Sequence, residues 1–236
     1  MSNYIEFSDP LDRFDWTRLF VRYDLMCKGF SAEAEYLTGL DIRLETDRTL
    51  YEHLIGRCQN ERSRNELSIE TYEAIMYWKL YSQPAAVANI CRKIRHDHAC
   101  RSQVIAGLAR LGKTFPKLLE RDTDKIEQLV ESIGRLNLPG MKTHPSLPVR
   151  TTLLHFIYPE TVPIFDKMVL RAVGIDQSGA NQDLNILRAY IPFAWQLADR
   201  YADKFKNWTA RATPVRLIDM ALWVERGTTL FTSAMP

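Results

Sequence analysis

Apolar residues recur at helical spacing along almost the whole chain, and this pattern limits the possible folds more than any other feature. Near the middle of the chain, Ile126, Leu129, Val130 and Ile133 fall at positions i, i+3, i+4 and i+7, which places them on one face of a helix. No segment keeps the alternation that is typical of a half-buried strand. The sequence therefore predicts an all-α fold of roughly ten to twelve helices, which form a single unit over residues 1–236.

Residues that favour helix ends predict where several of these helices begin and stop. Ser68 and Thr123 are residue types that cap helix N-termini, and Pro214 is a favoured first-turn residue for the last helix. Gly112 and Gly227 follow apolar periodic segments, so both are expected to end helices.

The composition is that of a globular protein and argues against a membrane-spanning or secreted one. The chain has 236 residues, of which 46% are hydrophobic and 25% are charged, as in ordinary globular domains. Its apolar runs fall far short of the roughly 18 residues that cross a bilayer, and its first ten residues have no apolar segment typical of a secretory signal. The four cysteines are irregularly spaced and are expected to be free thiols. A cytoplasmic protein without a membrane partner is predicted.

Positive charge is concentrated in residues 84–118. This stretch has seven lysines and arginines, among them Arg92, Lys93 and Arg95, against the single acidic residue Asp97. Such a stretch is typical either of a surface that binds a polyanion or of a solvated helix face, and the sequence leaves both interpretations open.

A candidate site lies in residues 136–173. A tight turn at residues 138–140 is followed by a loop, a helix from about Arg150 to Tyr158, and a further helix whose first turn holds Asp166. The partial positive charge of a helix N-terminus favours an ionised carboxylate. Such a carboxylate can accept a proton from water or stabilise a developing cation.

This region resembles the helix-hairpin-helix DNA glycosylases. The resemblance rests on LPG at 138–140, LLHFIYPETVPIFD at 153–166 and TPVRLIDMALWVERG at 213–227. It implies a compact, two-lobed domain with a hairpin-like segment at 136–158. It also implies an enzyme that flips a modified or damaged base from duplex DNA and hydrolyses its N-glycosidic bond. Asp166 would be the catalytic residue, and the product would be an abasic site.

The chain departs from the family pattern at two places. The usual hairpin continues Gly-Val-Gly, whereas here Gly140 is followed by Met141 and Lys142. Bifunctional members carry a catalytic lysine at the start of the next helix, where this chain has Arg150, Thr151 and Thr152. Arginine keeps its proton and cannot form a Schiff base. A monofunctional glycosylase that needs no cofactor is therefore predicted.

The remaining site residues follow from the resemblance and from the charge pattern. The residues expected to contact DNA are Gly140, Lys142, His144, Arg150, Thr151, Arg92, Lys93 and Arg95. The residues expected to line a pocket for the flipped base are His155, Tyr158 and Trp195. For His155 and the aromatic residues, a place in the hydrophobic core is the alternative.

Other interpretations remain open. Asp166 is also a typical N-cap, and without a catalytic role the chain would be a DNA-binding module on the same fold or a helical protein-interaction domain. The spacing of Cys91, His96, His98 and Cys100 matches no familiar zinc pattern, so no metal is predicted. The expected protein is a monomer that acts on duplex DNA in repair or in antiviral defence.

Overall fold

The computed structural model describes residues 5–27, 46–136, 138–139, 147–206, 208 and 212–232, without the side chains of Pro84 and of residues 227–232. Regular structure in these residues consists of ten α-helices and three short 3-10 helices, which confirms the prediction of an all-α fold. The α-helices are α1 (Leu19–Met26), α3 (Asp47–Ser63), α4 (Ile69–Leu80), α5 (Pro84–His96), α6 (His98–Thr114), α7 (Thr123–Arg135), α8 (Leu147–Ile157), α9 (Lys167–Ala172), α10 (Leu184–Arg200) and α11 (Pro214–Thr232). The 3-10 helices are η1 (Trp16–Arg18), η2 (Ala180–Gln182) and η3 (Ala202–Phe205).

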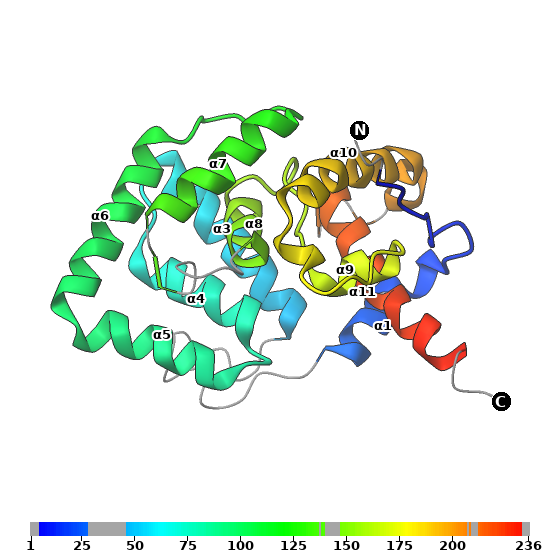
Figure 1. Cartoon of the computed structure of the whole chain (residues 1–236), viewed down its shortest axis with the longest axis horizontal. Coiled ribbons are helices and arrows are strands. Elements are labelled where there is room, and N and C mark those ends of the chain that lie inside the picture. The colour runs from blue at the N-terminus through cyan, green and yellow to red at the C-terminus, as the bar shows by residue number, and fades with distance from the viewer. Residues whose placement is uncertain are drawn as a thin grey trace.

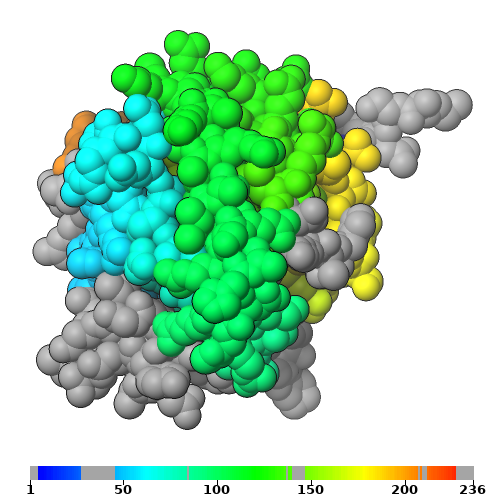
Figure 2. All heavy atoms as spheres, turned by 90° about the vertical axis from the view of Figure 1, so that its left-hand side faces the viewer, coloured from blue at the N-terminus to red at the C-terminus, as the bar shows by residue number. Residues whose placement is uncertain are grey.

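The helices form two groups. Helices α3 to α8 pack on one another, whereas α1, α9 and α10 pack on α11 (Figure 1). Helix α10 also packs on α7, so the two groups share a continuous hydrophobic core. Figure 2 views the outer face of the first group, where the green helices α5 to α7 lie beside the cyan helix α3. None of the helices in the described residues is both long and apolar enough to cross a membrane.

Caps define most helix starts, with one correction. Ser68 caps α4, because its side chain accepts a hydrogen bond from the Thr71 amide, and Pro214 is the first residue of α11. For α7 the cap is Asp122 and not Thr123, since the Asp122 carboxylate accepts a hydrogen bond from the Lys125 amide at 3.0 Å. Thr123 is the first helical residue.

The helix expected to end near Gly112 ends two residues later, whereas the helix expected to end before Gly227 continues past it. Helix α6 continues through Gly112 to Thr114, and α11 continues through Gly227 to Thr232. Residue 112 has to be a glycine because a Cβ atom there would lie 2.3 Å from the backbone oxygen of Asn65. Because glycine has no side chain, α6 can lie close to the turn after α3. Gly112 therefore serves this contact between two segments and does not end the helix.

Candidate functional site

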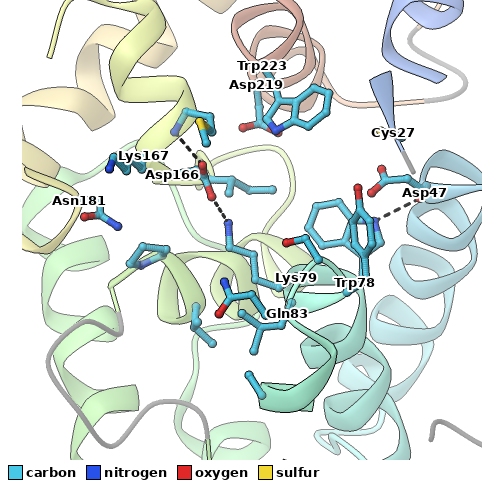
Figure 3. A pocket seen from close by; sticks show the side chains of 18 of the residues that line it. Cys27, Asp47, Trp78, Lys79, Gln83, Asp166, Lys167, Asn181, Asp219 and Trp223 are labelled. Atoms are coloured by element: carbon cyan, nitrogen blue, oxygen red, sulfur yellow. Dashed lines mark hydrogen bonds and ion pairs between the residues drawn. The ribbon is translucent and has the colours of Figure 1, made fainter. Parts of the chain in front are cut away.

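A cavity of about 880 Å³ lies where the two groups of helices meet (Figure 3). Side chains of α4, α5 and α8 line it on one side, and side chains of α1, α9 and α11 line it on the other. Its charged lining residues are Asp47, Lys79, Lys93, Asp166, Lys167, Arg216, Asp219 and Arg226, and its lining tryptophans and tyrosines are Tyr23, Trp78, Tyr81 and Trp223. Cavities of this size bind small molecules and cofactors in many proteins.

Asp166 is the N-cap of α9 and faces the cavity. Its Oδ1 accepts a hydrogen bond from the Met168 amide at 2.8 Å, and its Oδ2 lies 2.6 Å from Nζ of Lys79 on α4. Both interactions are visible in Figure 3. The carboxylate is 27% exposed, whereas the Lys79 side chain is 10% exposed. Asp166 therefore joins a helix cap to an ion pair that connects the two groups of helices.

These contacts keep Asp166 ionised. Burial by itself would raise the pKa of the carboxyl group, but the charge and hydrogen bond of Lys79 and the Met168 amide act against it and lower the pKa below its usual value. The result is a fixed negative charge in a partly enclosed cavity, where it acts more strongly on a developing cation than it would in water.

Thr151 fixes the segment that leads into Asp166, and its predicted contact with DNA is corrected. Its side chain is fully buried, so it does not face a nucleic acid on the surface. The Thr151 hydroxyl donates to the Leu147 oxygen at 2.9 Å and accepts from the Phe165 amide at 3.2 Å. These bonds tie the first turn of α8 to the residue just before Asp166, so Thr151 is a positioning residue.

His155 lies in the core and does not line the cavity. Its Nδ1 donates to the Val162 carbonyl at 2.6 Å, and its Nε2 accepts from the Tyr51 hydroxyl at 2.7 Å. Because a carbonyl only accepts, the tautomer is fixed with the proton on Nδ1. Burial lowers the pKa of His155 to about 3, so the ring is neutral. The structure thus gives His155 the core role that the sequence left open as an alternative.

Tyr158 and Trp195 also lie away from the cavity. The Tyr158 hydroxyl donates to the Pro116 carbonyl at 2.5 Å, and Nε1 of Trp195 donates to the Thr161 carbonyl at 2.6 Å. Neither ring is among the lining residues of the cavity. The aromatic rings that do line it come from α1, α4 and α11, and among them Trp223 belongs to the segment 213–227 that resembles the glycosylases.

Arg216 packs against three aromatic rings, of which Tyr23 and Trp78 line the cavity. The Arg216 guanidinium lies 5.3 Å from the ring centre of Tyr23, 4.7 Å from that of Tyr51 and 5.0 Å from that of Trp78. It also pairs with Asp219, one turn further along α11. Cation–π contacts of a buried guanidinium are stronger than exposed ones, so Arg216 helps to hold these rings together.

The basic residues predicted to bind DNA are divided among several environments. Arg92 and Lys93 are exposed on α5, and Lys93 lines the cavity. Arg95 is partly buried and pairs with Glu73 at 3.7 Å. Arg150 packs on α7, where a Cβ atom at Gly134 would lie 2.5 Å from its guanidinium carbon. Gly140, Lys142 and His144 lie outside the described residues.

The segment with two cysteines and two histidines has no sign of a metal centre. Cys91 and Cys100 are free thiols, as are Cys27 and Cys58. Within the part of the chain that the structure describes, no three His, Cys, Asp or Glu side chains are grouped so that they could hold a metal ion.

Lys79 is a site residue that no pattern in the sequence indicated. It lies in the last turn of α4, 87 residues before Asp166, and no local motif marks it. Its partner becomes visible only when the two groups of helices are brought together. Lys167, the neighbour of Asp166 in the chain, also lines the cavity.

Comparisons with known proteins add no assignment. No protein-family model matches the chain, and neither a curated protein nor a solved structure matches it.

Proposed function

We propose that this protein is a DNA glycosylase-like enzyme that takes a modified or damaged base out of duplex DNA and hydrolyses its N-glycosidic bond. The observation that carries the proposal is the setting of Asp166. Its carboxylate is ionised, is held at a helix N-terminus and faces a cavity lined by tryptophans and lysines. The resemblance in residues 138–140, 153–166 and 213–227 points to the same chemistry.

The charge of Asp166 suits the bond that must break. When an N-glycosidic bond breaks, the sugar becomes a cation that resembles an oxocarbenium ion. A carboxylate fixed beside that sugar stabilises the cation and orients the water that attacks it. The hydrogen bond from Met168 and the ion pair with Lys79 hold the carboxylate in place before the reaction, so little reorganisation is needed.

The cavity also suits a base that has left the helical stack. A flipped base is held by stacking and by hydrogen bonds to its edge. Trp223, which is partly exposed, offers an aromatic surface at the cavity wall, and the buried Trp78 also lines the cavity. Lys93 and Lys167 line the same cavity, and their ammonium groups suit the phosphates on either side of the extruded nucleotide.

Base removal by this site is expected to be monofunctional. Lys79 is the lysine that pairs with the carboxylate, and in its ion pair with Asp166 it is an ammonium group. An ammonium group has no lone pair with which to attack the sugar, so no Schiff base is expected from Lys79. Water remains the nucleophile, and the DNA strand stays intact.

A second candidate is a DNA-binding module without catalytic activity. The observation that favours it is that both oxygens of Asp166 already have structural partners, one as a helix cap and one in an ion pair. In that case the carboxylate would hold α4 and α9 together, and the basic residues of α5 would still bind phosphates.

The test is a search for the released base. The protein is incubated with duplex DNA that contains alkylated, oxidised or deaminated bases and with phage DNA that contains modified bases, and free bases are identified by mass spectrometry. We expect one class of free base, with an equal amount of abasic sites. DNA binding without any released base would favour the module without catalysis. If the protein does not bind DNA at low salt, the protein-interaction domain becomes the better interpretation.

A further inference from the structure

The floor of the cavity holds two buried carboxyl groups that share one guanidinium group. Arg216 pairs with Asp219 through Nη1, and its Nη2 lies 3.5 Å from Oδ1 of Asp47. All three residues are at most 4% exposed. If both carboxyl groups were ionised, the cluster would have an excess negative charge in a place that water hardly reaches, which is costly. The charge balance therefore favours one proton held by the two carboxyl groups.

The surroundings of the two carboxyl groups indicate which one holds this proton. Asp47 is the first residue of α3, where the helix N-terminus favours a negative charge, and it accepts a hydrogen bond from the Tyr23 hydroxyl at 2.7 Å. Asp219 lies in the second turn of α11, away from the helix end, and accepts a hydrogen bond from the Arg216 guanidinium. Burial raises the pKa of Asp219 to about 6, although Arg216 and Lys79 act in the opposite direction. Asp219 is thus the better place for the proton.

Asp219 faces the same cavity as Asp166, and the two carboxyl groups have opposite surroundings (Figure 3). Asp166 has a lysine of its own and a helix N-terminus, whereas Asp219 shares its arginine with a second acid. The charged and titratable groups around Asp219 are Arg216 and Arg226 from α11, Lys79 from α4, Asp166 and Lys167 at α9, Asp47 and Tyr51 from α3, Tyr23 from α1 and Tyr190 from α10. In a cavity with two acids, such a difference separates a proton donor from a permanent negative charge.

We propose that Asp219 is the general acid of this site and gives its proton to the leaving base, while Asp166 stabilises the sugar. The inference rests on the proposed function. As the bond between C1′ and the base nitrogen breaks, its electron pair goes to the base, and the Asp219 proton is transferred to the base. Water then adds its oxygen to C1′ and releases a proton, which restores the Asp219 carboxyl group. The sum is hydrolysis, and no oxidant, reductant or metal is consumed.

The first part of the test asks whether Asp219 holds a proton, and it needs no substrate. Infrared spectra of the wild-type protein are recorded between about pH 4 and 8 and compared with spectra of Asp219→Asn, Asp47→Asn and the exposed control Asp199→Asn. We expect one component of the protonated-carboxyl absorption to disappear as the pH rises through about 6, in addition to the absorption of the other carboxyl groups of the chain. In difference spectra against the wild type, this component should be absent in Asp219→Asn, displaced to lower pH in Asp47→Asn because Arg216 then serves one acid, and unchanged in Asp199→Asn. A component that is absent from the wild type, or that is lost in Asp47→Asn and kept in Asp219→Asn, overturns the proposal.

The second part asks whether this proton goes to the base. Single-turnover release of a neutral base should fall on the order of 10²–10⁴-fold in Asp219→Asn, because general acid catalysis is lost. Release of 7-methylguanine, which already leaves a cationic nucleotide, needs no such proton and should fall far less. Equal losses for the two bases, or no loss for the neutral base, overturn the role of Asp219 as the acid.

Two safeguards separate failure of this inference from failure of the proposed function. If Asp219→Asn does not fold, the wild-type protein still decides the question, since release of the neutral base should decline above about pH 6 whereas release of 7-methylguanine should not. If the wild-type protein releases no base from any DNA, the glycosylase and the acid role are both rejected, even where the infrared band behaves as expected. If bases are released and the rates of Asp219→Asn are unchanged, only the inference about Asp219 fails.

Discussion

The cavity has two clusters in which aspartates face a basic side chain, and the pKa shifts of the aspartates are opposite in the two clusters. In the first cluster, Lys79 pairs with Asp166, which also caps α9, and the pKa of Asp166 is lowered. At the floor, Arg216 faces two carboxyl groups, and burial raises the pKa of Asp219 and of Asp47. The number of acids for each cation, together with the nearest helix end, decides whether an aspartate is a fixed charge or a proton donor.

Apart from the loss expected for Asp219→Asn, the largest expected effect comes from removal of the negative charge of Asp166. Asp166→Asn should lower the single-turnover rate of base release on the order of 10²–10³-fold, because an amide cannot stabilise a cation by charge. The amide can still cap α9, but Lys79 loses its charged partner, so the melting temperature should fall while DNA affinity changes little. If base release is unaffected in this variant, Asp166 has no part in the chemistry.

Removal of the shared cation at the floor should mainly affect stability. Arg216→Leu leaves two buried carboxyl groups without their guanidinium, and we expect a loss of about 3–5 kcal/mol in the free energy of unfolding at pH 7. The loss should be smaller at pH 5, where the carboxyl groups can take up protons. The matched control is Arg121→Leu, since Arg121 pairs with Asp199 at 2.6 Å on the surface and should contribute less than about 1 kcal/mol. If urea titrations give equal losses of unfolding free energy for the two variants, the buried cluster around Arg216 contributes no more to stability than an exposed ion pair.

The two acids should also give opposite pH dependences of stability. Asp219 has a raised pKa, so the folded protein binds more protons there than the unfolded chain, and this contribution to stability is lost as the pH rises from about 4 to about 6. Asp166 has a lowered pKa, so its contribution is present above the unfolded pKa and is lost as the pH falls through the folded pKa.

Urea titrations of Asp219→Asn and Asp166→Asn at several pH values measure both slopes. The Asp219→Asn variant should lack the decline between pH 4 and 6, whereas Asp166→Asn should lack part of the acid-induced loss. If the pH profile of each variant runs parallel to that of the wild type, the assigned protonation states are wrong.

The smallest expected effect concerns the approach of DNA to the cavity. Arg92→Gln with Lys93→Gln should flatten the slope of log affinity against log salt by roughly one unit for each phosphate that the variant no longer neutralises. Lys113→Gln with Lys117→Gln is the comparison on α6 and the loop that follows it. Lys93 lines the cavity whereas Lys117 lies at another pocket, so the first pair should change the slope more. Fluorescence anisotropy at four salt concentrations distinguishes the pairs.

The helices are more predictable from the sequence than the site is. Periodicity and caps are local, so α4, α7 and α11 can be recognised from their own residues. The role of Gly112 is not local, because its neighbour, the Asn65 backbone, is distant in the chain. The same limit applies to Lys79, whose ion pair with Asp166 depends on how two groups of helices meet.

Aromatic side chains illustrate a different limit. Tyr158 and Trp195 have the size and chemistry of residues that stack on a base, but each bonds to a backbone carbonyl elsewhere in the core. Trp78 and Trp223 are also large aromatic side chains, but they line the cavity. Nothing in the local sequence separates the two pairs, because burial next to a cavity and burial next to a helix need the same residue types.

Strand integrity tests the central claim most directly. End-labelled duplex DNA that contains the released base is incubated with the wild-type protein, and half of each sample is heated in alkali before electrophoresis on a denaturing gel. We predict intact strands without alkali and strands broken at the position of the missing base after alkali. Intact strands in both halves would contradict the removal of a base. Strands broken before alkali, together with a borohydride-trapped adduct that is lost in Lys79→Met, would contradict hydrolysis by water and make Lys79 the nucleophile.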